Sequence, residues 1–282
     1  MLSQLVKNTT GFAARNGAIL RYASTDLTKS NWKQDVVYLV QFPRLPNGLP
    51  NASPYCLKIE TVLRVHDIKH EIISSMFKRS SRGLLPFIEL NGKQIADSQV
   101  IVWTLQKHFG IDVSLKIYSK RPGSDGLKGE DKGVARAVER MLDLSTNYAL
   151  LYDKSVLNGP VLLSRPVSGA PIPQFVANFL GKKFSDTAKR RIDGVFGRLS
   201  KDEIHALLRK DIEAIDAILG DKKFLFGDRI SLVDCTMFGQ LGATYYLPYR
   251  QKITDLLDDE FPRIKAYLQR IRTHYYPEWK DD

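Results

Sequence analysis

The sequence predicts an α/β domain followed by an all-helical domain, and three observations support this division. Residues 35–110 contain a strand–helix–strand unit followed by a hairpin and a helix. Residues 111–129 are rich in Gly, Lys and Ser, which is typical of a linker. Residues 130–276 show only helical spacing of apolar residues, and residues 277–282 form a tail. A chain of 282 residues is long enough for two compact cores.

The α/β domain opens with the β-branched and aromatic run Val36–Phe42, which predicts a buried strand. Several prolines and a glycine then predict an extended loop that ends near Ser53. Pro54 suits the first turn of a helix, and Cys56–Val65 has apolar residues at helical spacing. Lys69–Ser74 predicts a second strand, and such a β-α-β unit favours parallel pairing.

The second half of this domain is predicted to be a hairpin and a helix. Phe87–Leu90 and Lys93–Ala96 flank Asn91-Gly92, a strong signal for a two-residue hairpin turn. Helical spacing follows from Ser98 to Phe109. This order of elements is that of a thioredoxin-like domain.

The all-helical domain is predicted from apolar periodicity and from helix-start signals. Residues 130–154 carry apolar side chains on one face, whereas glycines and prolines interrupt residues 158–173. Ser200 and Glu203 form a capping box that opens a helix over Lys201–Leu219.

Ser231 and Asp234 predict a second capping box before an apolar helix. Because both residues serve one cap, we expect replacement of either by alanine to destabilise the protein by about 1 kcal/mol, with non-additive effects. Pro262 begins a last helix that runs to about His274.

Composition and charge exclude several classes of function. The net charge is +11, but +4 of it lies in residues 1–34, and the rest is spread over helices that also carry Asp and Glu. No recognition helix and no interleaving of aromatic and basic residues is present, so we expect no nucleic-acid partner. The histidines and cysteines lack metal-ligand spacing, and no apolar run could span a bilayer, so we expect neither a metal site nor a transmembrane helix.

Residues 1–34 form a separate leader. Met1–Thr25 contains Lys7, Arg15 and Arg21 and no acidic residue, a composition typical of a mitochondrial presequence. A disordered or membrane-surface arm has the same composition, so both interpretations stay open.

Two pairs of residues are candidates for ligand binding. In thioredoxin-like folds an X-Pro bond before an edge strand is cis, and the preceding residue presents its backbone to a bound peptide, so Leu85-Pro86 predicts such a bond. A trans proline that only opens the strand is the alternative. Asp97 and Ser98 stand at a helix N-terminus, where an acid, a hydroxyl and backbone N–H groups can hold an amino-acid-like group. Simple helix capping is the alternative there.

Ser53-Pro-Tyr-Cys56 determines the chemistry that is available at this site. A cysteine at the position of Ser53 would make a dithiol redox motif, whereas a serine excludes disulfide exchange. The Ser53 hydroxyl could stabilise a bound thiolate as a catalytic group, and capping without catalysis is the alternative. Tyr148 and Tyr152 lie four residues apart and could line a hydrophobic substrate cleft, although core packing explains the same spacing.

The sequence resembles the failed axon connections family over about residues 35–280. This family includes the nematode cadmium-responsive proteins and is similar to metaxins. The resemblance rests on the segments at 53–61, 85–92, 95–98 and 197–204 and on Phe-Gly-Asp followed by Ser-x-x-Asp at 226–234.

The resemblance implies a glutathione S-transferase fold. It also implies glutathione as ligand or co-substrate, with its γ-glutamyl end at Asp97-Ser98 and its sulfur at Ser53, for conjugation to a small electrophile. A non-catalytic scaffold in axon development or at the mitochondrial membrane, with a protein or membrane partner, is the alternative. The compartment does not follow from the resemblance, and we expect a mitochondrial or cytoplasmic location from the leader Met1–Thr25, with a homodimer possible.

Overall fold

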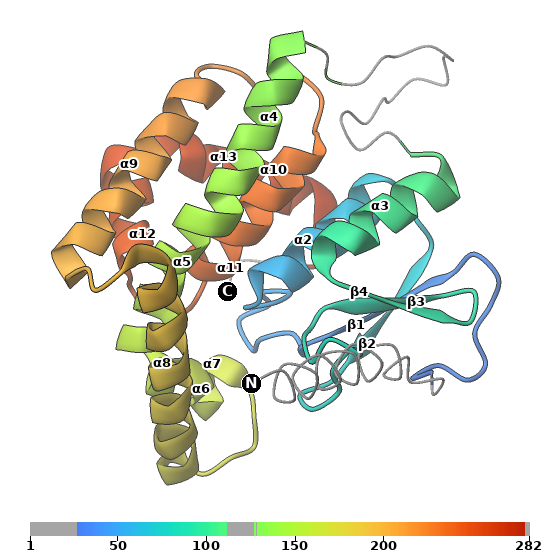
Figure 1. The fold of residues 1–282 in the computed structure, drawn as a ribbon, viewed down its shortest axis with the longest axis horizontal. Helices are drawn as coiled ribbons and strands as arrows, with labels where there is room; N and C mark the ends of the chain where they lie inside the picture. The colour runs from blue at the N-terminus through green and yellow to red at the C-terminus, as the bar shows by residue number, and fades with distance from the viewer. Residues whose placement is uncertain (1–26, 112–126, 128, 280–282) are drawn as a thin grey trace, which may run out of the picture.

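The computed structural model describes residues 27–111, 127 and 129–279 and shows an α/β domain packed against an all-helical domain (Figure 1). The predicted presequence lies outside the described residues, as does most of the predicted linker. The elements of the first domain are β1 (Val37–Gln41), α2 (Pro54–Val65), β2 (His70–Ser74), β3 (Phe87–Leu90), β4 (Lys93–Ala96) and α3 (Ser98–Phe109).

The strands of the described residues form one mixed sheet in the order β2-β1-β3-β4. β1 pairs in parallel with β2, with Val37 opposite His70, as the β-α-β unit predicts. β3 is antiparallel to both β1 and β4. The hairpin turns at Asn91 and Gly92, whose φ angles of 49° and 76° are those that a two-residue turn requires. The predicted thioredoxin-like order is therefore confirmed.

The two faces of the sheet are covered differently. α2 and α3 pack on one face, where Val37 and Leu39 join their apolar residues in the main core (Figure 1). Residues 75–86, all of them described, form no helix that could cover the other face. The segment that begins at Thr28 covers this face instead. The backbone N–H groups of Thr28 and Lys29 donate to the buried Glu89 carboxylate at 2.7 and 2.9 Å.

The second domain contains only helices and one isolated bridge in its described residues. Its elements, with η for a π-helical segment, are α4 (Gly129–Met141), η1 (Leu142–Thr146), α5 (Asn147–Leu151), η2 (Tyr152–Leu157), α6 (Gly159–Leu163), α7 (Arg165–Ser168), α8 (Gln174–Phe196), α9 (Lys201–Leu219), α10 (Leu232–Met237), η3 (Phe238–Gly242), α11 (Ala243–Tyr245), α12 (Lys252–Asp255), η4 (Leu256–Glu260) and α13 (Pro262–Tyr275). The predicted all-helical second domain is therefore confirmed.

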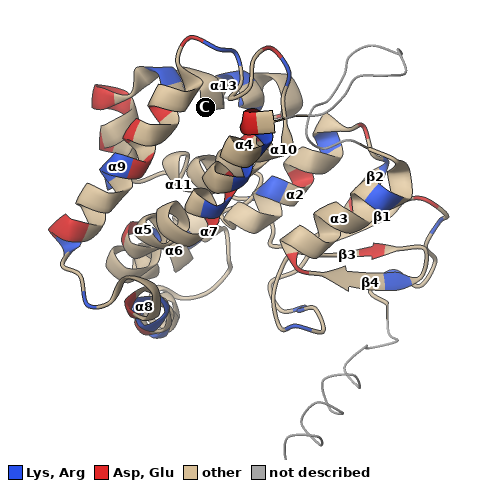
Figure 2. Cartoon of the chain, turned by 45° about the horizontal axis from the view of Figure 1, so that its top comes forward, with Lys and Arg blue, Asp and Glu red and all other residues tan. Residues whose placement is uncertain are grey.

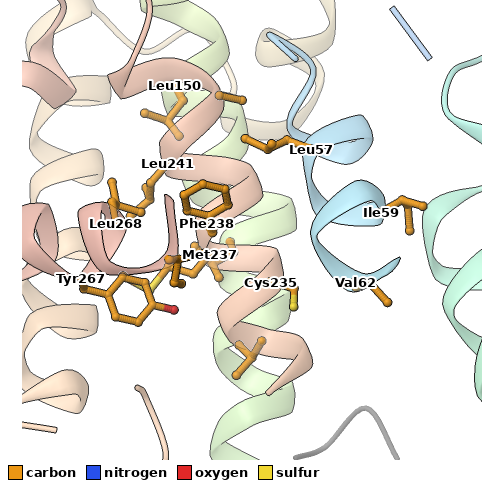
Figure 3. Close-up of a cluster of buried hydrophobic side chains, with 14 of the residues drawn as sticks. Leu57, Ile59, Val62, Leu150, Cys235, Met237, Phe238, Leu241, Tyr267 and Leu268 are labelled. Atoms are coloured by element: carbon orange, nitrogen blue, oxygen red, sulfur yellow. The ribbon is translucent and has the colours of Figure 1, made fainter. Parts of the chain in front are cut away.

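The two domains meet where α2 packs against η3. Gly239 allows this approach, because a Cβ atom there would lie 2.7 Å from the Pro54 carbonyl oxygen. Figure 3 shows Leu57 pointing toward Phe238 and the helical domain, whereas Ile59 points to the opposite side of α2. Helix α2 therefore belongs to the cores of both domains, which fixes its N-terminus relative to the helical domain.

The predicted capping box at α10 is present, and Asp234 has further hydrogen-bond partners beyond it. Its carboxylate accepts hydrogen bonds from the Ser231 backbone N–H at 2.7 Å and the Ser231 hydroxyl at 2.6 Å. It also accepts from the Leu225 backbone N–H at 3.0 Å and the Tyr267 hydroxyl at 2.8 Å. Asp234 is fully buried, so this carboxylate joins the connector before α10, the helix itself and α13.

Candidate functional site

The candidate site lies at one end of the sheet, where three chain segments meet. Val40, Phe87 and Ala96 are cross-strand partners in a single row. β1 and β4 run toward this end of the sheet and β3 runs away from it. The row therefore gathers the residues that lie next to it in the chain, which are Phe42 after β1, Pro86 before β3 and Asp97 after β4.

Asn51 ties the start of α2 to the end of β1. Its side-chain amide donates to the Phe42 carbonyl at 2.8 Å, and its Oδ1 accepts from the Ser53 backbone N–H at 2.9 Å. Asn51 is buried, so these bonds are shielded from water. The sheet end thus holds Ser53 at the N-terminus of α2, close to the segments that carry Pro86 and Asp97.

Ser53 stands before the first residue of α2 with an extended backbone, and its side chain makes no capping hydrogen bond to the described helix. Its hydroxyl lies near the thiol of Cys56 instead. Burial raises the pKa of Cys56 to about 12, although the nearby Ser53 hydroxyl opposes that shift. Cys56 therefore stays a thiol at neutral pH, and the partly exposed Ser53 is the polar group that the motif presents to solvent.

The Leu85-Pro86 peptide bond is cis, as predicted. Pro86 is buried, and Leu85 packs against Val40, Phe87 and Ala96 on the face of the sheet opposite α2. Residues 75–86, which lead to this bond, contain Lys78, Arg79 and Arg82 and no acidic residue. The loop therefore supplies positive charge beside the site.

Asp97 and Ser98 form the start of α3. Asp97 Oδ1 accepts hydrogen bonds from the backbone N–H groups of Gln99 at 2.9 Å and Val100 at 3.3 Å, so Asp97 is a true N-cap. Its other oxygen, Oδ2, lies 3.7 Å from Nη1 of Arg82. Asp97 has a φ of 82°, a backbone conformation that non-glycine residues rarely adopt and that is often associated with functional sites.

Tyr148 and Tyr152 occupy different surroundings. Tyr148 is half-buried on α5, with its ring centroid 6.3 Å from that of Phe196. Tyr152 is buried in the main hydrophobic core. Tyr55, on the first turn of α2, lies near Tyr148, and burial together with the charge of Asp143 raises the pKa of Tyr55 well above its ordinary value. Tyr148 and Tyr152 therefore do not line one common surface, and Tyr55 lies near Tyr148.

A cluster of polar residues, here called the junction cluster, adjoins the site: Lys58, Gln99, Glu139, Asp143 and Gln240. Gln99 follows Ser98 directly, and its amide donates to Glu139 at 2.9 Å and to Asp143 at 3.3 Å. The Lys58 ammonium lies 3.1 Å from Glu139, and Gln240 donates to Asp143 at 3.1 Å. The N-terminus of α3 is therefore fixed to the helical domain by partly buried hydrogen bonds from Gln99.

Lys154 is a buried cation beneath the loop that carries Ser53. Its ammonium donates to the Ala52 carbonyl at 3.0 Å and to Thr244 Oγ1 at 3.3 Å, and the residue is 5% exposed. Among the described residues no carboxylate lies within 4.0 Å of it. Burial lowers the pKa of Lys154 to about 8. Ala52 precedes Ser53, so Lys154 places a titratable amine next to the candidate site.

We expect Lys154 to make the stability of the protein depend on pH in the alkaline range. Its pKa of about 8 in the folded protein is below the ordinary lysine value, so the unfolded chain binds more protons between these two values. The free energy of unfolding should therefore rise by roughly 1–2 kcal/mol from pH 8 to pH 10. Urea unfolding of the wild type and of Lys154→Met at four pH values tests this expectation, since the variant should lack the rise.

Two cavities lie away from the candidate site. One, of about 170 Å³, is lined by Phe224, Ile230 and Tyr275 among others, and the other, of about 420 Å³, lies beside Val134 and Ile218. The described residues contain no cluster of three metal-ligating side chains. They also contain no helix with the length and hydropathy needed to cross a membrane.

The sequence matches two family models. Residues 54–159 match the glutathione S-transferase N-terminal domain, and residues 208–271 match the glutathione S-transferase C-terminal domain. The chain is 32% identical over 267 residues to Failed axon connections of Drosophila melanogaster, a match that covers 90% of this chain and 61% of that protein. This chain therefore spans less than two thirds of the length of that relative.

Two further relatives are more distant. Isoprene-epoxide–glutathione S-transferase of Rhodococcus is 25% identical over 238 residues, which is 81% of this chain and 94% of that enzyme. Metaxin-2 of Mus musculus is 23% identical over 205 residues, which is 71% of this chain and 73% of that protein.

Solved structures agree with the fold. The β-etherase LigF of a Sphingobium strain superposes with a TM-score of 0.57 at 16% identity, over 86% of this chain and 98% of the other. A glutathione S-transferase of Methylobacillus flagellatus with glutathione bound superposes with a TM-score of 0.52 at 16% identity, over 87% of this chain and 100% of the other.

Proposed function

Because this chain belongs to the glutathione S-transferase-fold proteins and is related to Failed axon connections, we propose that it binds glutathione and presents the thiol to electrophiles. The observation that carries this proposal is the gathering of Ser53, the Leu85-Pro86 bond and Asp97-Ser98 at one end of the sheet. The Leu85 backbone would pair with the peptide part of the ligand. Ser98 and the α3 N-terminus would hold its γ-glutamyl carboxylate.

The charges around the site support an anionic peptide ligand that also carries an ammonium group. Asp97 Oδ2 is 3.7 Å from Arg82, a long contact that a ligand ammonium could replace. Arg82 would then be free to meet a ligand carboxylate, for which a guanidinium is well suited. The Ser53 hydroxyl would donate to the ligand sulfur and stabilise its thiolate, so conjugation to an electrophile is the reaction that this geometry favours.

We expect Ser53→Ala and Asp97→Ala to affect different steps. Ser53→Ala should lower kcat about 100-fold and change the glutathione Kd little, because it removes a donor to the thiolate. Asp97→Ala should weaken glutathione binding about ten-fold or more, because a charged hydrogen bond contributes about 1.5–3 kcal/mol. Calorimetric titration with glutathione measures binding, and turnover with an epoxide and with a chlorodinitrobenzene measures catalysis.

Ser200→Ala is the matched control, since Ser200 caps α9 and lies outside the candidate site. It should lower stability slightly and leave both measurements unchanged. Absence of glutathione binding by the folded wild type would refute the proposal. Binding that depends on Asp97 but is unaccompanied by turnover would limit the function to glutathione binding.

A non-catalytic scaffold is the second candidate function, and one observation favours it. Asp97 already caps α3 and meets Arg82, so this carboxylate has partners within the protein, and the Ser53 hydroxyl lies near the Cys56 thiol. In that case the fold would serve a protein or membrane partner, and a second copy of the chain is one candidate.

The location of the protein is a separate proposal. Met1–Thr25 has three cations and no acidic residue, which supports a mitochondrial rather than a cytoplasmic location. A fluorescent fusion of this segment would test it.

A further inference from the structure

Helix α8 exposes an unusual number of large apolar side chains. Phe175 is 75% exposed and Phe179 is 60% exposed, and Leu180 and Phe184 are exposed as well. Phe175 and Phe179 are four residues apart and therefore lie on the same side of the helix. Phe175 and Phe179 are here called the outer surface of α8, whereas Phe184 is nine positions after Phe175 and lies on the opposite side of the helix. Single exposed apolar residues are ordinary, but two neighbouring, largely exposed phenylalanines mark an interaction surface.

Positive charge accompanies this surface. Residues 174–196 carry five Lys and Arg and two Asp, a net charge of +3 within one helix (Figure 2). Lys182 and Lys183 are exposed and lie between Phe179 and Phe184 in the chain. The Lys183 ammonium lies 4.6 Å from the centroid of the Phe179 ring. Long basic side chains beside aromatic rings suit an anionic interface, because the alkyl stem stays with the rings while the ammonium reaches the charged groups.

The inner side of α8 is fixed to the protein. Ala177, Gly181, Ala188 and Ile192 are its buried residues. At Gly181 a Cβ atom would lie 2.5 Å from the Pro160 Cα, so α6 and α8 are in backbone contact. Figures 1 and 2 both show α8 at an edge of the helical domain, remote from β3 and β4. The outer surface is therefore held rigidly outward, away from the candidate glutathione site.

We propose that the outer surface of α8 binds anionic lipid bilayers. Phe175 and Phe179 enter the boundary between headgroups and acyl chains, and Lys182 and Lys183 meet the lipid phosphates and carboxylates. Exposed rings combined with neighbouring ammonium groups favour this occupant over an apolar protein groove, which would leave the two lysines without counter-charges. The outer surface extends no farther than one helix, so the contact is peripheral and reversible.

Sedimentation of the full chain with vesicles tests the proposal. Wild-type protein should sediment with vesicles of phosphatidylcholine and phosphatidylserine at low salt, and less with phosphatidylcholine alone or at high salt. Phe175→Ser/Phe179→Ser should lower the partition coefficient about ten-fold or more, because two rings then stay out of the interface. Lys182→Gln/Lys183→Gln should reduce binding and weaken its salt dependence.

Phe77→Ser is the matched control, because Phe77 is 92% exposed and lies in the loop between β2 and β3. It should bind like the wild type, and circular dichroism should show that all variants are folded. Equal binding of the wild type and Phe175→Ser/Phe179→Ser would overturn the proposal, because the contact would then lie elsewhere, for example on the basic residues 1–26. Failure of the wild type to bind anionic vesicles would overturn it as well, and α8 would then be a surface for an acidic protein.

Discussion

Replacing Asp234 by alanine should lower the free energy of unfolding by about 3–4 kcal/mol, because four buried donors lose their acceptor at once. These donors are the backbone N–H groups of Leu225 and Ser231 and the hydroxyls of Ser231 and Tyr267. Ser231→Ala removes only the hydroxyl that donates to Asp234 and should lower the free energy of unfolding by about 1 kcal/mol. Urea denaturation followed by circular dichroism measures both changes.

The two substitutions are therefore unequal, which corrects the expectation drawn from the capping motif alone. A cap on an exposed helix would make Ser231 and Asp234 equivalent partners, but Asp234 also serves α13 through Tyr267. Tyr267→Phe is the control for this additional bond. The loss from Asp234→Ala and Tyr267→Phe together should be smaller than the sum of the single losses. Strict additivity, or equal losses from Asp234→Ala and Ser231→Ala, would contradict this account.

Local signals predicted the architecture because they are properties of short segments. The Asn91-Gly92 turn needs two residues with positive φ, and a capping box needs a serine and an acid three residues apart. Both signals are complete within the sequence that forms them. The order of such segments then limits the topology, because a β-α-β unit favours parallel strands.

The surroundings of the site residues could not be predicted in the same way. Arg82 meets Asp97 from a loop fifteen positions earlier, and Lys154 reaches Ala52 across 102 positions. No periodicity or motif relates such partners, since the contact exists only after the domains have packed. Ser53 and Cys56 lie within one helical turn of each other, but the Ser53 hydroxyl can either cap the helix or donate to a ligand. Only the folded structure shows that it makes no cap.

Helix α8 shows a further limit of the sequence. Three of its four buried residues are alanine or glycine, so the apolar periodicity that predicts other helices is weak there, and Phe175 and Phe179 face outward. A pattern that assigns large apolar side chains to a core would place Phe175 and Phe179 inside the protein. The close contact between Gly181 and Pro160 reverses this orientation, because only small side chains fit between α6 and α8.

Replacing Glu139 by glutamine should lower the free energy of unfolding by about 3–5 kcal/mol, since it leaves the Lys58 ammonium buried without a counter-charge. Lys58 is 1% exposed, and its partner across the domain junction is Glu139 at 3.1 Å. Lys58→Met should have a smaller effect, because Gln99 and Arg136 continue to donate to the Glu139 carboxylate at 2.9 and 2.8 Å. Thermal and urea unfolding of the single variants and of the double variant measure the coupling.

The double variant Lys58→Met/Glu139→Gln should recover much of the loss, because no buried charge is then left unpaired. Arg209→Met is the matched control, since Arg209 pairs with Glu213 and Glu260 at the exposed surface, and its effect should stay below about 1 kcal/mol.

Burial opposes ionisation of Glu139, but Lys58, Gln99 and Arg136 together lower its pKa below the ordinary value. The stabilisation is therefore present at neutral pH and is lost as the pH falls below about 4. In Glu139→Gln this acid-dependent loss should be reduced, and an unchanged acid transition would show that the carboxylate is not the group that joins the two domains.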